Sequence, residues 1–199
     1  MAVRETIQRA EAGPAAAVLP RAVAGTIGVA AFMVMTALGA QVRIPLPWTP
    51  VPITLQTFFV ALAGATLGPV LGPLSQVAYL GAGAAGLPFF AGGGSGFAYL
   101  FGASTAGYLI GFPLATAITG RLVRLKGDPT ALWILFSMAA GSLVIYGCGA
   151  WWLIWGFGLS LPSAVAKGVV PFLVGDALKT CGAAGLYRSY RRHAQILFP

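Results

Sequence analysis

The sequence predicts an all-α integral membrane protein with six transmembrane helices. Of its 199 residues, 58% are hydrophobic and only 8% are charged, whereas about 25% of residues are charged in an ordinary soluble domain. No Lys, Arg, Asp or Glu occurs between Ile44 and Gly120, and a second uncharged run extends from Pro129 to Ala166. A membrane-spanning helix needs roughly 20 residues. The chain therefore holds about six spans with short connections, and no separate soluble domain.

Apolar stretches separated by proline and glycine define the spans in chain order. The first covers 22–40 and ends before a proline-rich loop at 41–52. The second and third are short, at 54–67 and 70–86, and are divided by Gly68-Pro69 because these residues mark turns.

The remaining spans follow a glycine-rich loop at 87–98. We place the fourth at 99–122 and the fifth at 130–157, on either side of Asp128-Pro129. A short amphiphilic piece at 163–170 precedes the sixth span, 172–190. Pro171 divides these two because proline has no N–H group to continue a helix.

The distribution of cations predicts the orientation, because cytoplasmic loops of membrane proteins are enriched in Lys and Arg. A cytoplasmic N-terminus places nine cations inside the cell: Arg4, Arg9, Arg21, Arg121, Arg124, Lys126, Arg188, Arg191 and Arg192. Arg43 and Lys167 then lie outside, and Lys179 lies within the last span. We expect 1–21 to be a cytoplasmic segment, not a cleaved signal peptide, because its apolar stretch is too short. Residues 191–199 form a basic cytoplasmic tail in this scheme.

Several other functions are excluded. The net charge of +8 does not indicate nucleic-acid binding, because the cations lie between apolar spans and not on one folded surface. Cys148 and Cys181 lie in apolar segments, where a thiol behaves as a small hydrophobe, so we assign them no metal or redox role. The glycines of 81–86 do not form a nucleotide site, since no strand precedes them and Pro88 follows. We expect no cofactor.

The strongest candidate for a functional site is the pair Asp176 and Lys179. These residues are three apart and therefore project from the same face of a helix. Charged residues inside a membrane span are energetically costly, so they usually face the bundle interior and carry function. The alternative is a structural pair whose members only neutralise each other.

Neutral polar residues on the same outer side extend the candidate site. Glycines in the loop can approach a ligand closely and present backbone N–H groups. Thr54 can cap the second span and Gln56 adds an amide in its first turn, while aromatic residues offer apolar walls. The candidate binding residues, together with the charged pair, are Thr54, Gln56, Phe90, Gly92, Gly93, Gly94, Ser95, Tyr99 and Tyr108.

Small residues at four-residue spacing allow helices to pack closely. The first span carries two such ridges, one formed by Ala22, Thr26 and Ala30 and the other by Ala24 and Gly28. Such ridges usually serve packing within a protein. On the first span they are also candidates for docking a partner.

Four motifs in order resemble the BioY family, the biotin-specific substrate-capture components of energy-coupling factor transporters. They are VPITLQTF at 51–58, GLPFFAGG at 86–93, GYLIGF at 107–112 and PFLVGDALK at 171–179. The resemblance covers nearly the whole chain. It implies that 22–190 form a six-helix substrate-binding domain in the bacterial inner membrane, which captures biotin near the outer face and performs no chemistry.

The resemblance also implies partners and residue roles. A coupling module of one transmembrane protein and two cytoplasmic ATPases would drive release of biotin inside the cell, although some members are thought to work without that module. By position, Asp176 and Lys179 match the family's binding pair, and Gly92 to Ser95 match its substrate loop. The family's Ala-x-x-x-Ala docking ridge is absent from the first span. The sequence does not specify an oligomeric state.

Biotin suits the residues identified independently. Its ureido ring needs donors and acceptors, and its thiophane ring and valeryl chain need apolar walls. Lys179 and the glycine loop are both candidates for binding its carboxylate. Three alternatives remain: capture of another vitamin, an intramembrane enzyme using Asp176 as general acid or base, and a purely structural membrane subunit. The hypothesis of an intramembrane enzyme lacks support because no second carboxylate, histidine or metal cluster accompanies Asp176.

Overall fold

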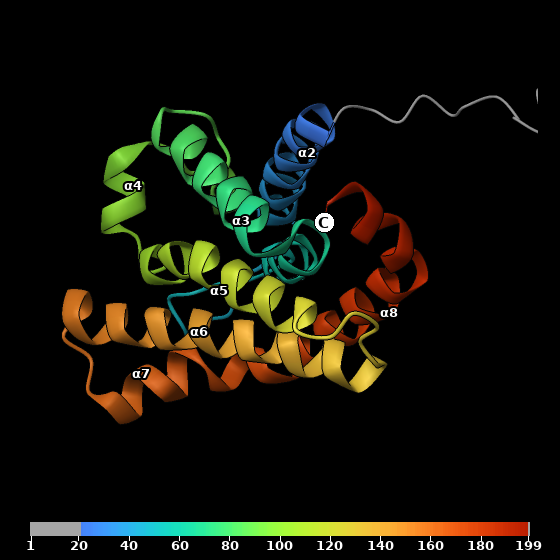
Figure 1. Ribbon diagram of the computed structural model, residues 1–199. Helices are drawn as coiled ribbons and strands as arrows, with labels where there is room; N and C mark the ends of the chain where they lie inside the picture. The colour runs from blue at the N-terminus through green and yellow to red at the C-terminus, as the bar shows by residue number, and fades with distance from the viewer. Residues whose placement is uncertain (1–20, 199) are drawn as a thin grey trace, which may run out of the picture.

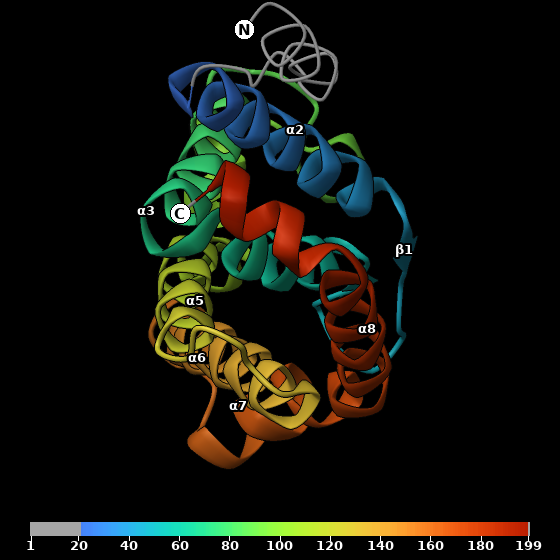
Figure 2. The ribbon, with the colours of Figure 1, turned by 45° about the vertical axis from the view of Figure 1, so that its right-hand side comes forward.

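The computed structural model describes residues 21–198. Most of the expected cytoplasmic segment 1–21, including Arg4 and Arg9, therefore lies outside the described residues. Within these residues the chain is helical apart from one short hairpin and the connecting loops, and the long helices are arranged around one another (Figures 1 and 2). The elements are α2 (Arg21–Gln41), β1 (Arg43–Ile44), β2 (Ile53–Thr54), α3 (Gln56–Ala84), η1 (Ala91–Gly93), α4 (Gly96–Gly102), α5 (Ala106–Arg124), α6 (Ala131–Phe157), α7 (Leu161–Gly168), η2 (Val170–Phe172) and α8 (Leu173–Leu197).

Five helical stretches among residues 21–198 are long and apolar enough to cross a membrane. They are Arg21–Gln41, Gln56–Ala84, Ala106–Arg124, Ala131–Phe157 and Leu161–Leu197. The expected second and third spans correspond to the two parts of α3, which consists of two helices joined at Gly68. The protein is therefore a multi-pass membrane protein.

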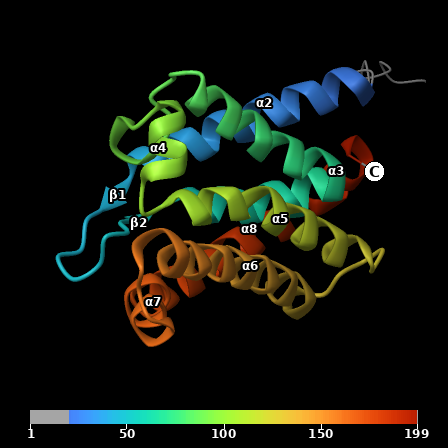
Figure 3. The same cartoon turned by 90° about the vertical axis from the view of Figure 1, so that its left-hand side faces the viewer.

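Helix α3 reverses its direction at Gly68. This residue has φ 81° and ψ −169° inside an otherwise helical segment, a conformation open mainly to glycine. A Cβ atom on Gly72 would lie 3.3 Å from the Cα atom of Gly64, although eight residues of straight helix would span about 12 Å. The first limb, 56–67, and the second limb, 69–84, thus run back along each other, as Figure 3 shows.

The expected fourth span begins later than the sequence indicated. Residues 96–102 form the separate helix α4, and α5 starts only at Ala106. The helical conformation is interrupted at Ala103, whose backbone is extended (φ −74°, ψ 151°). Two bonds hold this break: Trp152 Nε1 donates to Ala103 O (3.1 Å) and Ser104 Oγ donates to Pro50 O (2.7 Å). Tyr99 therefore lies outside the long helix.

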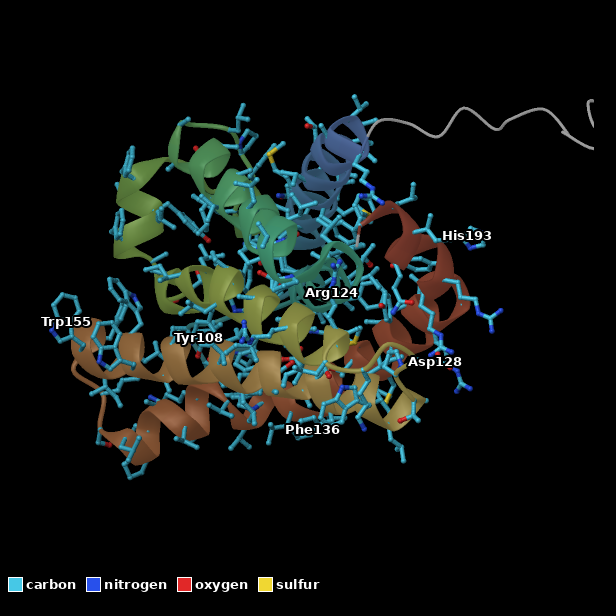
Figure 4. The ribbon with its side chains drawn as sticks, in the orientation of Figure 1. Tyr108, Arg124, Asp128, Phe136, Trp155 and His193 are labelled. Atoms are coloured by element: carbon cyan, nitrogen blue, oxygen red, sulfur yellow. The ribbon has the colours of Figure 1, made fainter. Side chains whose placement is uncertain are left out.

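The two ends of the molecule differ in character (Figure 3). The hairpin end carries β1, β2, α4 and α7. The basic end carries the α5–α6 connection, the start of α2 and the end of α8. Figure 4 shows Trp155 at the hairpin end, far from Asp128 and His193 at the basic end.

The expected basic tail is part of helix α8. Arg191 pairs with Asp128 and donates to Pro129 O, in the α5–α6 connection. Arg124 donates to Phe198 O, and the ring of Phe198 occupies the space beside Gly28 on α2. Residues 191–198 are consequently docked across the basic end.

Small residues bring the central helices together. Gly107 and Gly111 on α5 face Cys148 on α6, and a Cβ atom on Gly111 would lie 3.1 Å from that of Cys148. A Cβ atom on Gly64 of α3 would lie 2.8 Å from the backbone oxygen of Thr116 on α5. Close helix contact through glycine is typical of membrane bundles. The limbs of α3 thus pack closely with α5, and α5 with α6.

Candidate functional site

Asp176 and Lys179 form an ion pair at the start of α8. Helix α8 begins directly after Pro171 and η2, which places Asp176 in its first turn, where the helix dipole stabilises an acidic group. Lys179 Nζ lies 2.6 Å from Asp176 Oδ1, and the carboxylate side chain is 9% exposed. The spacing inferred from the sequence therefore brings the two charges together.

Two further hydroxyl groups complete the coordination of Asp176. Thr57 on the first limb of α3 donates to Oδ1 (2.9 Å), and Tyr146 on α6 donates to Oδ2 (2.6 Å). Lys179 Nζ also donates to Thr54 O (2.7 Å) and to Thr57 Oγ1 (3.2 Å). All three N–H groups of this ammonium are thereby used. The result is a polar cluster that joins α3, α6 and α8.

Sequence reasoning did not assign Thr57 or Tyr146 to the site. Thr57 follows Gln56 directly, so it was visible within the motif at 51–58, but nothing in the sequence showed that it would face α8. Tyr146 is the single tyrosine of α6. A lone phenol in an otherwise apolar span was a usable signal, because a buried Tyr hydroxyl usually has a hydrogen-bond partner.

A chain of hydrogen bonds fixes the orientation of Gln56. Tyr79 Oη donates to Phe89 O (3.3 Å), so it accepts from Gln56 Nε2 (2.7 Å). The amide oxygen of Gln56 consequently points to Thr54, whose hydroxyl donates to it (3.1 Å). Thr54 was expected to cap the helix. Instead Leu55, which has no side-chain acceptor, is the N-cap residue, and the Thr54 hydroxyl bonds to Gln56.

These groups border a cavity at the hairpin end. Its wall combines the polar cluster with apolar side chains from α5, α6 and the loop before β2. The lining residues are Val51, Pro52, Thr54, Gln56, Thr57, Thr105, Tyr108, Leu109, Phe112, Ile145, Tyr146, Phe172, Asp176 and Lys179. The volume of this cavity is about 50 Å³, whereas the volume of a small-molecule pocket is usually about 300 Å³ or more. A ligand of that size therefore requires the walls to move apart.

Tyr108 contributes its ring to this cavity. Its hydroxyl is already engaged, because it donates to Gly168 O in α7 (2.8 Å). Figure 4 shows the side chain lying near α6 in the part of the molecule toward Trp155. Of the residues expected from the sequence, Asp176, Lys179, Gln56, Thr54 and Tyr108 thus share one cavity wall.

The glycine-rich loop lies apart from the cavity wall. Phe90 is fully buried and stacks on Tyr99, with ring centroids 5.2 Å apart. Gly92 and Gly93 have positive φ (71° and 79°), and the side chain of Arg43 lies over Gly92. None of the expected loop residues, Phe90, Gly92, Gly93, Gly94, Ser95 and Tyr99, lines the cavity.

The loop is nevertheless linked to the cavity. Phe89 O accepts from Tyr79, which in turn accepts from Gln56 on the cavity wall. Gln41 at the end of α2 also donates to Phe90 O and Pro88 O (3.3 Å each). The position of the loop is therefore coupled to the polar groups of the wall through one buried tyrosine.

No group of three or more His, Cys, Asp or Glu side chains that could hold a metal ion occurs within residues 21–198. Cys148 and Cys181 are free thiols on different helices. The polar cluster has one acid, one base and two hydroxyl groups, a donor set suited to hydrogen bonding with an organic ligand.

The two small-residue ridges of α2 have different environments. Ala24 and Gly28 are buried, and Gly28 lies against Leu67 and Phe198. These two residues are therefore used for internal packing. Ala22, Thr26 and Ala30 are exposed. Of the two ridges, only the one formed by Ala22, Thr26 and Ala30 is exposed on the surface of the described residues.

Comparison with known proteins assigns the chain to a protein family. The pattern of the BioY family matches residues 12–196. The chain belongs to the BioY family. It is 43% identical over 155 residues to the probable biotin transporter BioY of Pyrococcus horikoshii, covering 78% of this chain and 88% of that protein. It is 39% identical over 153 residues to the biotin transporter BioY of Thermotoga maritima, covering 77% and 87%.

A solved structure agrees with the family assignment. The chain resembles the crystal structure at 2.1 Å of the S-component for biotin from an ECF-type ABC transporter, with a TM-score of 0.81 and 25% sequence identity. The likeness covers 89% of this chain and 96% of the other. This BioY-family chain thus shares its helical architecture with a transporter component.

Proposed function

We propose that this chain captures biotin at its hairpin end and serves as the substrate-specific component of an ECF-type uptake system. The observation that carries the proposal is the cavity in which a buried, fully hydrogen-bonded Asp176–Lys179 pair meets apolar walls. Biotin has a polar ureido ring and an apolar thiophane ring with a valeryl chain. A wall of mixed polarity complements both parts, and nothing in the proposal requires a chemical reaction.

The proposal includes six crossings of the cell membrane. Each limb of α3 counts as one crossing, which adds a sixth to the five apolar stretches. The start of α2 and the end of α8 lie at the same end of the molecule (Figure 3), as an even number of crossings requires. The basic end carries Arg121, Arg124, Lys126, Arg188 and Arg192, so it faces the cytoplasm by the positive-inside rule. The hairpin end then faces outward.

Purified protein in detergent is expected to bind radiolabelled biotin, and excess unlabelled biotin should displace it. Thiamine and riboflavin should not compete, because neither has the fused ureido and thiophane rings of biotin with an acidic valeryl chain. Competition by either vitamin at the concentration at which biotin competes would identify a capture protein for a different ligand. Mass spectrometry of the released ligand should return unchanged biotin; a modified product would favour the intramembrane enzyme.

We also propose that the exposed ridge of α2, formed by Ala22, Thr26 and Ala30, docks the transmembrane protein of a coupling module. Small residues in this row allow a partner helix to approach closely, and all three are exposed. The neighbouring row of Ala24 and Gly28 is already covered from within.

Ala30→Trp is expected to reduce co-purification of a tagged chain with an untagged coupling module, because the indole blocks close helix contact. Biotin binding by the isolated chain should be unchanged, since Ala30 lies outside the cavity wall. Leu143→Trp is the matched control, because Leu143 is also exposed, on α6. Equal recovery of the module with both variants would contradict docking through this ridge.

A further inference from the structure

One polar group on the cavity wall has no partner. Thr105 lines the cavity, and its hydroxyl oxygen is buried without a hydrogen bond to any group of residues 21–198. The other polar side chains of the wall bond to one another or to the backbone. A buried hydroxyl without a partner destabilises the folded state, so the empty protein carries a cost at this position.

The local backbone keeps the hydroxyl unpartnered. Thr105 is the N-cap residue of α5, where threonine usually accepts a bond from the first turn of the helix. Here its backbone is helical (φ −85°, ψ −8°) and no cap bond forms. The preceding residues are held by Trp152 at Ala103 and by Pro50 at Ser104. Thr105 is therefore fixed in a position that does not satisfy its own side chain.

The charges around the cavity indicate which group of a ligand fits beside Thr105. Lys179 already directs its three N–H groups to Thr54, Thr57 and Asp176, so it has no donor left for an anion without breaking the pair. Thr105 stands at the N-terminal end of the 19-residue helix α5. That end carries the positive pole of the helix and N–H groups without intrahelical acceptors, which favours a negatively charged group.

We propose that Thr105 is a specificity-determining residue whose hydroxyl donates to the carboxylate of the bound ligand. The assignment rests on the proposed function, since it takes biotin as the ligand. It separates two tasks on one wall: the cluster around Asp176 serves the uncharged ring, and the start of α5 serves the anionic end. The unpartnered hydroxyl is a cost in the empty protein that ligand binding removes.

Thr105→Val keeps the side-chain shape and removes the hydroxyl. We expect it to weaken binding of biotin by about 10- to 100-fold, the range for hydrogen bonds to charged groups, while binding of biotin methyl ester changes by less than about threefold. Thr105→Ser retains a hydroxyl and should restore most of the affinity. Without ligand, the unfolding temperature of Thr105→Val should equal or exceed that of the parent, because a buried unpartnered group is removed.

Binding of both ligands to each variant, measured by isothermal titration calorimetry, tests the assignment. Thr130→Val, at the N-cap of α6 and outside the cavity wall, is the matched control and should bind both ligands as the parent does. Equal losses for biotin and its methyl ester, or no loss for either, would overturn the role of Thr105 while leaving the proposed function intact. Failure of the parent to bind biotin would instead remove the proposed function, and this assignment with it.

Discussion

Asp176→Asn is expected to weaken biotin binding at least tenfold, a loss of about 1.5 to 3 kcal/mol. The carboxylate accepts from Thr57 and Lys179 through one oxygen and from Tyr146 through the other. An asparagine of the same shape offers one acceptor oxygen and an NH₂ group, which would face a donor. The polar cluster would lose its arrangement, and the ammonium of Lys179 would lose its counter-ion. Titration of the purified variant with biotin measures the effect.

Asp128→Asn is the matched control for this substitution. Asp128 pairs with Arg191 at the basic end, and its side chain is 80% exposed. Because it lies outside the cavity wall, the control should bind biotin as tightly as the parent. Parental affinity in Asp176→Asn would show that the cluster around Asp176 is a structural pair and not part of the binding site.

Lys179→Met should have the largest effect on stability. Removal of the ammonium leaves Asp176 buried with two hydroxyl donors and no counter-ion. Breaking a buried ion pair in this way costs about 3 to 5 kcal/mol. The unfolding temperature of the variant in detergent, without ligand, should therefore fall well below that of the parent. Lys167→Met, at an exposed position of α7, should leave it unchanged.

The double variant Asp176→Asn/Lys179→Met separates stability from binding. Without either charge, no ion remains unpaired, so the double variant should recover much of the stability lost in Lys179→Met. It should still fail to bind biotin with parental affinity. A Lys179→Met protein as stable as the parent would mean that the carboxylate does not need the ammonium, and the double variant would then show no recovery.

Much of the fold follows from apolar length and from proline and glycine in the sequence. The expected span 130–157 coincides with α6 (Ala131–Phe157), and the interruption at Pro171 separates α7 from α8. Gly68-Pro69 correctly indicated the division between the two limbs of α3, but not that the limbs pack along each other. The start of α5 was misplaced because the break at Ala103 depends on bonds from Trp152 and Ser104, which only the folded protein brings together.

Part of the candidate site could also be predicted from the sequence, where the relation between residues is local. Asp176 and Lys179 could be paired from spacing on one helix, since that relation is local. Thr57, Tyr146 and Thr105 belong to three other parts of the chain, and their approach to the cavity depends on how α3, α5 and α6 pack. The glycine loop was placed with the binding residues because it lies on the same side. The hydrogen bonds that link the loop to the cavity wall pass through Tyr79, a buried side chain with no charge to mark it.

The reversal of α3 at Gly68 has a consequence for biogenesis. Its first limb has 12 residues and its second has 16, and at 1.5 Å per residue these measure about 18 and 24 Å. Each limb is shorter than the roughly 30 Å of a bilayer core, so each crossing that we propose for α3 requires a locally thinner bilayer. The two limbs carry no charged residue, although they bury the polar side chains of Gln56, Thr66, Ser75 and Gln76. Because the two limbs pack along each other through Gly64 and Gly72, we expect them to enter the bilayer together, as one hairpin.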